Sequence, residues 1–151
     1  MAYKKLKPQN YSKENIESAM REIWKNEYCI KENPIMTFDN IQVSFYEDMF
    51  DHCFYESANN KMRDKSILSL NRLEKMLWIK DTLQDETAIL KLGWHRDKKV
   101  YLNNRRVNFV KGNYVVVISV NKQKTKARFI TAYEILEAEN IEKINNSPDW
   151  E

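Results

Sequence analysis

The run YVVVISV (114–120), apolar except for one serine, constrains the fold of this chain more than any other segment. Its β-branched and aromatic residues favour a strand, and its lack of alternation is typical of a strand covered on both faces. The segments KGN before it and NKQKTK after it are short enough to form hairpins with the neighbouring strands. The run therefore predicts the middle strand of an antiparallel sheet.

Other segments with a period of two place further strands around this one. We expect strands over 88–92, 100–102, 106–109 and 128–135, and a strand or hairpin over 35–46 with its turn at Asp39 and Asn40. Apolar residues at helical spacing predict helices over 12–28, 48–61 and 66–86, and Ile141 and Ile144 are compatible with a last helix. The fold class is therefore α+β, with N-terminal helices packed on a four- to five-stranded antiparallel sheet.

The length of 151 residues is typical of one domain that buries a substantial core. Within this single domain (1–151) we distinguish an N-terminal extension of helix and strand or hairpin (1–47), a core (48–136) and an acidic tail (137–151). The tail holds five acids and one lysine, whereas 91–128 holds eleven Lys or Arg and a single acid. Such a basic segment indicates an anionic polymer as partner, RNA or DNA above all, although a solvated basic face remains an equal alternative.

Motifs for several function classes are missing from the sequence. It contains no phosphate-binding glycine loop, no HExxH, no GxSxG and no paired CxxC, and its two histidines have no ligand spacing for zinc. We expect no metal and no cofactor. The chain has no apolar N-terminal signal and no run long enough for a membrane span, and its two cysteines indicate reduced thiols, so we expect a cytoplasmic protein without membrane contact.

RNA can be cleaved without metal if a protein moves protons and stabilises charge on the phosphate. Arg72 and Lys75, three residues apart on the predicted helix, would project on one side of it. In FITAYEI (129–135), alternation would place Phe129, Thr131 and Tyr133 on one face of a strand. Each feature has an ordinary structural explanation, as flanking charge on a helix and as β-propensity.

The order of these segments resembles a known group. FDHCFYES, then RLEKMLWIKDTL, then a meander ending in FITAYEI, is similar to the phage-associated barnase/EndoU/colicin/RelE-like ribonucleases over roughly residues 51–135. The resemblance implies a metal-independent ribonuclease fold of helices on a four-stranded antiparallel sheet. It also implies His52, Arg72, Thr131 and Tyr133 as site residues. Lys75 stands where a second arginine is expected, and the first fifty residues have no counterpart.

Together these features predict a toxin-like, metal-independent endoribonuclease that attacks RNA, with transfer RNA one candidate target, through the 2′-hydroxyl to give a 2′,3′-cyclic phosphate. His52, Arg72, Lys75, Thr131 and Tyr133 would be catalytic, and an inhibitory partner protein would control the activity. Four cations are candidates for substrate phosphates: Arg96, Arg105, Arg106 and Lys111. The alternative is a non-catalytic nucleic-acid-binding or adaptor domain that uses the basic surface of 91–128.

Overall fold

The computed structural model describes residues 3–56, 67–92, 94–95, 100–101 and 106–149. Its main sheet contains six strands in the order β1-β2-β10-β9-β8-β5. The strand bounds are β1 Ile35–Met36, β2 Gln42–Ser44, β5 Ile89–Leu92, β8 Arg106–Lys111, β9 Tyr114–Val120 and β10 Lys126–Glu134. Two-residue strands form two further pairs, β3 Tyr55–Glu56 with β4 Ile67–Leu68, and β6 Trp94–His95 with β7 Val100–Tyr101.

The α+β class is confirmed, but the sheet has more strands than predicted, and it is mixed where an antiparallel sheet was predicted. β5, β8, β9 and β10 form an antiparallel four-stranded unit, as expected from the two short hairpin turns. The N-terminal extension adds β1 and β2, and β2 lies parallel to β10, which makes the sheet mixed. The β1–β2 hairpin turns at Asn40, where φ is +68°, and the β8–β9 hairpin turns at Gly112, where φ is +61°. Both residue types adopt this left-handed conformation readily.

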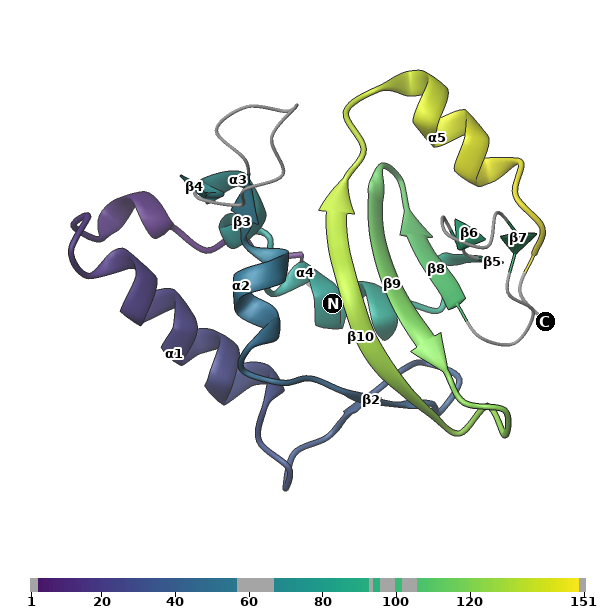
Figure 1. Cartoon of the computed structure of the whole chain (residues 1–151), viewed down its shortest axis with the longest axis horizontal. Helices are drawn as coiled ribbons and strands as arrows, with labels where there is room; N and C mark the ends of the chain where they lie inside the picture. Colours follow the sequence, from purple (N-terminus) through teal and green to yellow (C-terminus); the bar gives the residue numbers. More distant parts are fainter. Residues whose placement is uncertain (1–2, 57–66, 93, 96–99, 102–105, 150–151) are drawn as a thin grey trace.

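Most of the helices gather on one face of the sheet or beside it, and the last one lies against the opposite face (Figure 1). They are η1 Pro8–Asn10, α1 Ile16–Tyr28, α2 Met49–Cys53, α3 Leu70–Glu74, α4 Trp78–Leu83 and α5 Ala138–Asn145. The first five of these surround the main core, in which Trp24 lies 1% exposed against Phe45, Phe54 and Phe129. No helix in the described part of the chain is long and apolar enough to cross a bilayer.

The single helix predicted over 66–86 is wrong, because the segment contains β4, α3 and α4 with a turn at 75–77. The hydroxyl of Tyr28 donates to the carbonyl oxygen of Met76 at 2.6 Å and accepts from the backbone N–H of Lys80 at 3.0 Å. It thus replaces the bond that a continuous helix would make between these two residues. Similarly, only Met49–Cys53 of the helix expected over 48–61 is helical among the described residues.

The alternation predicted over 129–135 is also wrong in one respect. The pairing of β10 with β9 shifts between Phe129 and Thr131, which is a β-bulge with Ile130 as the extra residue. Phe129 therefore faces the main core together with Ala132, and it does not share a face with Thr131 and Tyr133. Before the bulge, the even-numbered Arg128 faces away from the main core, whereas after it the odd-numbered Thr131 and Tyr133 do so.

A buried carboxylate, Asp85, joins the N-terminal segment to the sheet. It accepts hydrogen bonds from the Tyr3 hydroxyl at 2.7 Å and from the Thr87 backbone N–H at 2.9 Å, and it pairs with Lys111 at 3.4 Å. These bonds, those from Thr87 foremost, hold the pKa of Asp85 well below its ordinary value. A depressed folded-state pKa means that the ionised form stabilises the fold above the unfolded-state pKa of about 3.9.

We expect Asp85→Asn to lower the free energy of unfolding at pH 7 by about 1–3 kcal/mol. The difference between the two proteins should shrink as the pH falls below about 4, because the wild-type carboxylate loses its advantage there. Urea unfolding at pH 7 and at pH 3 measures both effects, with Glu86→Gln as the exposed neighbouring control. A difference that stays constant between the two pH values would contradict this role.

Candidate functional site

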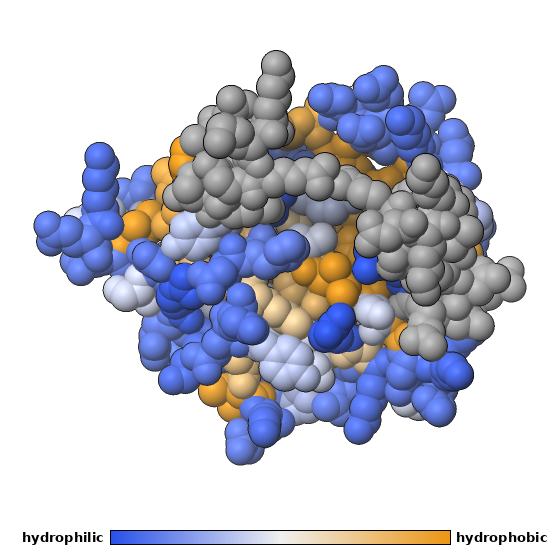
Figure 2. All heavy atoms as spheres, in the orientation of Figure 1, coloured by the Kyte–Doolittle hydropathy of each residue, from blue (hydrophilic) through white to orange (hydrophobic). Residues whose placement is uncertain are grey.

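The face of the sheet opposite the main core carries three of the described candidate residues, Arg106, Thr131 and Tyr133. Residues paired across neighbouring strands share a face. The registers of β8, β9 and β10 therefore form three rows on this face: Arg106–Ser119–Arg128, Asn108–Val117–Thr131 and Val110–Val115–Tyr133. Figure 2 views the molecule from this side and shows apolar atoms exposed at its centre, surrounded by hydrophilic side chains. We call these nine residues, with Ile130 of the bulge, the open face.

Two arginines stand in the same row of the open face. Arg106 and Arg128 both pair with Ser119, one from each side, so two strand spacings, roughly 10 Å, separate their backbones. Within the described part of the chain, neither guanidinium forms an ion pair with a carboxylate. Arg128 is exposed and Arg106 is half-buried, and both belong to one row that crosses β9.

Helix α5 crosses the other end of the open face (Figure 1). Its Ile141 and Ile144 pack against Val115 and its neighbours, but none of its residues is fully buried. A cavity of about 1,030 Å³ remains between the helix and the sheet. The cavity is lined on the sheet side by Arg106, Asn108, Thr131 and Tyr133, and on the helix side by Glu139, Glu142 and Lys143, among others. The acidic tail therefore lies against the basic sheet surface.

Thr131 and Tyr133 lie on this face two residues apart, both half-buried. Burial raises the pKa of Tyr133 above its ordinary value, and the positive charge of Arg72 opposes part of this rise. A raised pKa keeps the phenol protonated at neutral pH, so Tyr133 can donate a hydrogen bond but does not accept a proton there.

His52 lies on the exposed side of α2, which runs beside β10. The buried neighbours Phe50 and Cys53 fix the helix against the core, while the imidazole points away from it. A shallow cavity of about 390 Å³ contains His52 together with residues of the preceding loop, of α2 and of β10: Tyr46, Asp48, Met49, Arg128, Phe129 and Ile130. His52 is thus not a core residue, and it shares its cavity with one of the two arginines of the open face.

Arg72 connects α3 to the end of α2. Its Nη1 donates to the carbonyl oxygen of Cys53 at 2.9 Å, directly after His52 in the chain. The cation therefore binds a carbonyl at the C-terminus of the short helix, where positive charge is favourable. This contact fixes the backbone that carries His52.

Lys75 is 5% exposed at its side chain and surrounded by anionic groups. Its Nζ pairs with Glu74 at 3.2 Å and with Glu134 at 3.5 Å, and it lies 5.6 Å from the centre of the Trp78 ring. Because α3 ends at Glu74, Lys75 turns toward β10 while Arg72 turns toward α2. Lys75 lies one residue beyond α3, so the expectation that both cations belong to one helix is wrong.

Two neighbouring cavities contain four of the predicted residues, His52, Arg106, Thr131 and Tyr133, whereas Arg72 and Lys75 line neither of them. His52 and Arg128 line one, and Thr131, Tyr133 and Arg106 line the other, with Ile130 common to both. Lys111 lies apart from them, where it pairs with Asp85. Arg96 and Arg105 are outside the described residues.

Sequence reasoning missed three polar residues of these cavities: Tyr46, Asn108 and Arg128. The exposed–buried–exposed alternation of Lys126, Ala127 and Arg128 was readable in the sequence and could have identified the arginine. The partners of Arg128 across the sheet could not be read, because they depend on register.

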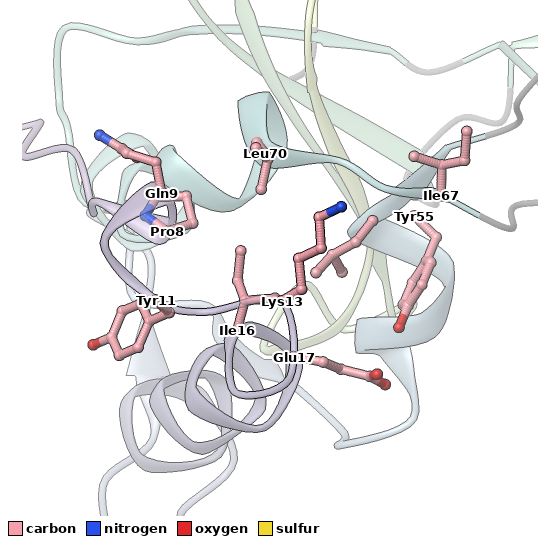
Figure 3. Close-up of a pocket in the computed structure, with 10 residues that line it drawn as sticks. Pro8, Gln9, Tyr11, Lys13, Ile16, Glu17, Tyr55, Ile67 and Leu70 are labelled. Atoms are coloured by element: carbon pink, nitrogen blue, oxygen red, sulfur yellow. The ribbon is translucent and has the colours of Figure 1, made fainter.

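Beyond these cavities, a metal-binding cluster and one further groove are the remaining candidates for a site in the described chain. No group of three or more His, Cys, Asp or Glu side chains converges there in a way that could hold a metal ion. A groove of about 760 Å³ lies between the N-terminal segment and the β3–β4 pair, with Tyr11, Lys13 and Glu17 on one side and Ile67 and Leu70 on the other (Figure 3). It contains none of the predicted site residues.

The chain was compared with known proteins. It has no significant match to a family model, a curated protein or a solved structure. The class of protein is therefore defined by its architecture, an α+β fold whose main core lies on one face of a mixed sheet and whose other face carries Arg106 and Arg128.

Proposed function

We propose that the protein is a metal-independent endoribonuclease. In this proposal the 2′-hydroxyl of RNA attacks the adjacent phosphorus and the bond from phosphorus to the 5′-oxygen breaks. A base accepts the proton of the hydroxyl, and an acid returns a proton to the leaving oxygen. The products are a 2′,3′-cyclic phosphate and a 5′-hydroxyl. The observation that carries the proposal is the shared cavity of His52 and Arg128 beside the open face.

Each residue has a role that follows from its surroundings. His52 exchanges the protons, since imidazole changes charge near neutral pH and this one is exposed. Arg128, in the same cavity, stabilises the negative charge of the phosphorane. Thr131 and Tyr133 donate to phosphate oxygens, while Arg106 holds a neighbouring phosphate.

Arg72 and Lys75 act through other groups in this proposal. Arg72 positions His52 through the Cys53 carbonyl, and Lys75 positions β10 through Glu134. The toxin-like role, transfer RNA as a target and an inhibitory partner protein remain part of the proposal.

Incubation of the purified protein with total RNA in the presence of EDTA tests the reaction. We expect cleavage that leaves cyclic phosphate or 3′-phosphate ends, detected by end-group analysis. EDTA removes divalent metal, and the 2′-hydroxyl mechanism alone accounts for such ends. Intact RNA after long incubation with folded protein would contradict the catalytic proposal.

The second candidate is a non-catalytic nucleic-acid-binding domain, favoured by the two arginines of the Arg106–Ser119–Arg128 row, which form no ion pair among the described residues. Such a domain would bind RNA with an affinity that falls steeply with salt and would leave the RNA intact. Gel-shift titrations at two salt concentrations, run beside the cleavage assay, separate the two functions.

A further inference from the structure

An exposed aromatic ring stands at the cavity of His52. Tyr46 is 53% exposed, and the cavity that it lines also contains Arg128. A single exposed tyrosine is unremarkable on a protein surface. An exposed ring beside a cation is different, because this combination recurs where proteins bind single-stranded nucleic acid.

The backbone of Tyr46 is held in place while its ring stays exposed. The Trp24 indole, which is 1% exposed, donates its Nε1–H to the carbonyl oxygen of Tyr46 at 3.0 Å. The Tyr46 backbone N–H in turn contacts the Met49 sulfur at 3.4 Å. These contacts hold the backbone of Tyr46 in place, so the loop would not have to become ordered when a ligand binds the ring.

Arg128 supplies a positive charge to the lining of the cavity. It extends from β10 on the open face, and it has no ion pair within the part of the chain that the structure describes. His52 of α2 and Asp48 of the loop complete the polar lining. The cavity volume of about 390 Å³ lies at the small end of the roughly 300–1,000 Å³ of ligand pockets, which suits one nucleotide.

We propose that Tyr46, Arg128 and His52 form a subsite for one unstacked nucleotide of single-stranded RNA. The base stacks on the Tyr46 ring, the phosphate binds the Arg128 guanidinium, and the ribose lies toward His52. Asp48 at the rim accepts a hydrogen bond from an exocyclic amino group of the base. A base in a duplex is stacked on both sides, so single strands are the substrate class that this geometry admits.

This inference rests on the proposed function for the class of polymer, but its test does not require cleavage. The probe is a fluorescein-labelled single-stranded 2′-O-methyl oligoribonucleotide, which lacks the attacking hydroxyl and stays intact. We expect Tyr46→Ala to weaken its binding about 5- to 150-fold in fluorescence anisotropy titrations, because the stacked ring is lost. Tyr46→Trp should retain binding.

Tyr11→Ala is the matched control, since Tyr11 is 44% exposed and lies in the separate groove of Figure 3. It should change binding less than about twofold. Equal losses for Tyr46→Ala and Tyr11→Ala, or no binding of the oligonucleotide at all, would overturn the subsite. Cleavage of unmodified RNA, measured separately, decides the proposed function independently of this result.

The contribution of the Arg128 charge to binding can be measured separately, from the salt dependence of the affinity. Arg128→Ala should reduce the slope of log affinity against log salt by about 1, as expected for one lost phosphate contact. Lys122→Ala removes a charge from the exposed β9–β10 turn and should change the slope less. Equal changes in slope would show a diffuse basic surface and would contradict a built subsite.

Discussion

His52→Ala is expected to reduce RNA cleavage about 10²–10⁴-fold, the range contributed by a general acid or base. The fold should be unaffected, because the imidazole is exposed on α2 and forms no hydrogen bond within the described part of the chain. Initial rates of cleavage of a fluorogenic RNA substrate measure the effect, and thermal unfolding of both proteins measures the fold. A large loss of activity with an unchanged melting temperature would assign a chemical role to the residue.

The other histidine of the chain provides the matched control for this variant. His95→Ala makes the same substitution in β6, a different element of the chain. It should leave cleavage within about twofold of wild type, as is usual for substitutions away from a site. If both variants lose activity to the same extent, or if His52→Ala cleaves normally, His52 is not the proton carrier.

Lys75→Ala is expected to lower the free energy of unfolding by about 3–5 kcal/mol. The substitution removes the cation from a buried group of charges and leaves Glu134, which is 20% exposed at its side chain, without its partner. For a chain of this length the loss corresponds to a fall in melting temperature of roughly 6–20 °C. Thermal unfolding followed by circular dichroism gives both quantities, and urea unfolding checks the free energy.

A surface ion pair close in sequence serves as the control for Lys75. Lys80 pairs with Glu27 at 3.0 Å, but Glu27 is 41% exposed, and such pairs contribute about 0–1 kcal/mol. Lys80→Ala should therefore cost at most about a third as much as Lys75→Ala. The double variant Lys75→Met with Glu134→Leu removes both charges and should recover part of the stability. A Lys75→Ala protein of normal stability and reduced cleavage would instead assign Lys75 a direct catalytic role.

The local patterns predicted the antiparallel part of the fold well. The turns at Gly112 and in NKQKTK, with the apolar run between them, identified β8, β9 and β10 as successive hairpins. These features depend on turn chemistry and on strand propensity, which are properties of neighbouring residues. The parallel contact of β2 with β10 could not be predicted in the same way, because it joins segments some eighty residues apart.

The site was predictable only in part, for a related reason. Thr131 and Tyr133 were expected together and do share the open face. The bulge at Ile130 moved Phe129 to the other face, and no residue type at that position signals it. The break between α3 and α4 is bridged by the Tyr28 hydroxyl, which lies on another helix and replaces the helical bond from Lys80 to Met76.

The sequence by itself determined the α+β class, the hairpins around 114–120, and the residues from which a site could be built. Its patterns act over a few residues and therefore specify elements and the side chains that each element carries. Tertiary structure alone decided that Arg128 and His52 line one cavity, and that Arg106 and Arg128 lie on opposite sides of Ser119. It also decided that the buried Lys75 pairs with Glu134. These placements depend on strand register and on which elements pack together, and both are set by the burial of the whole core.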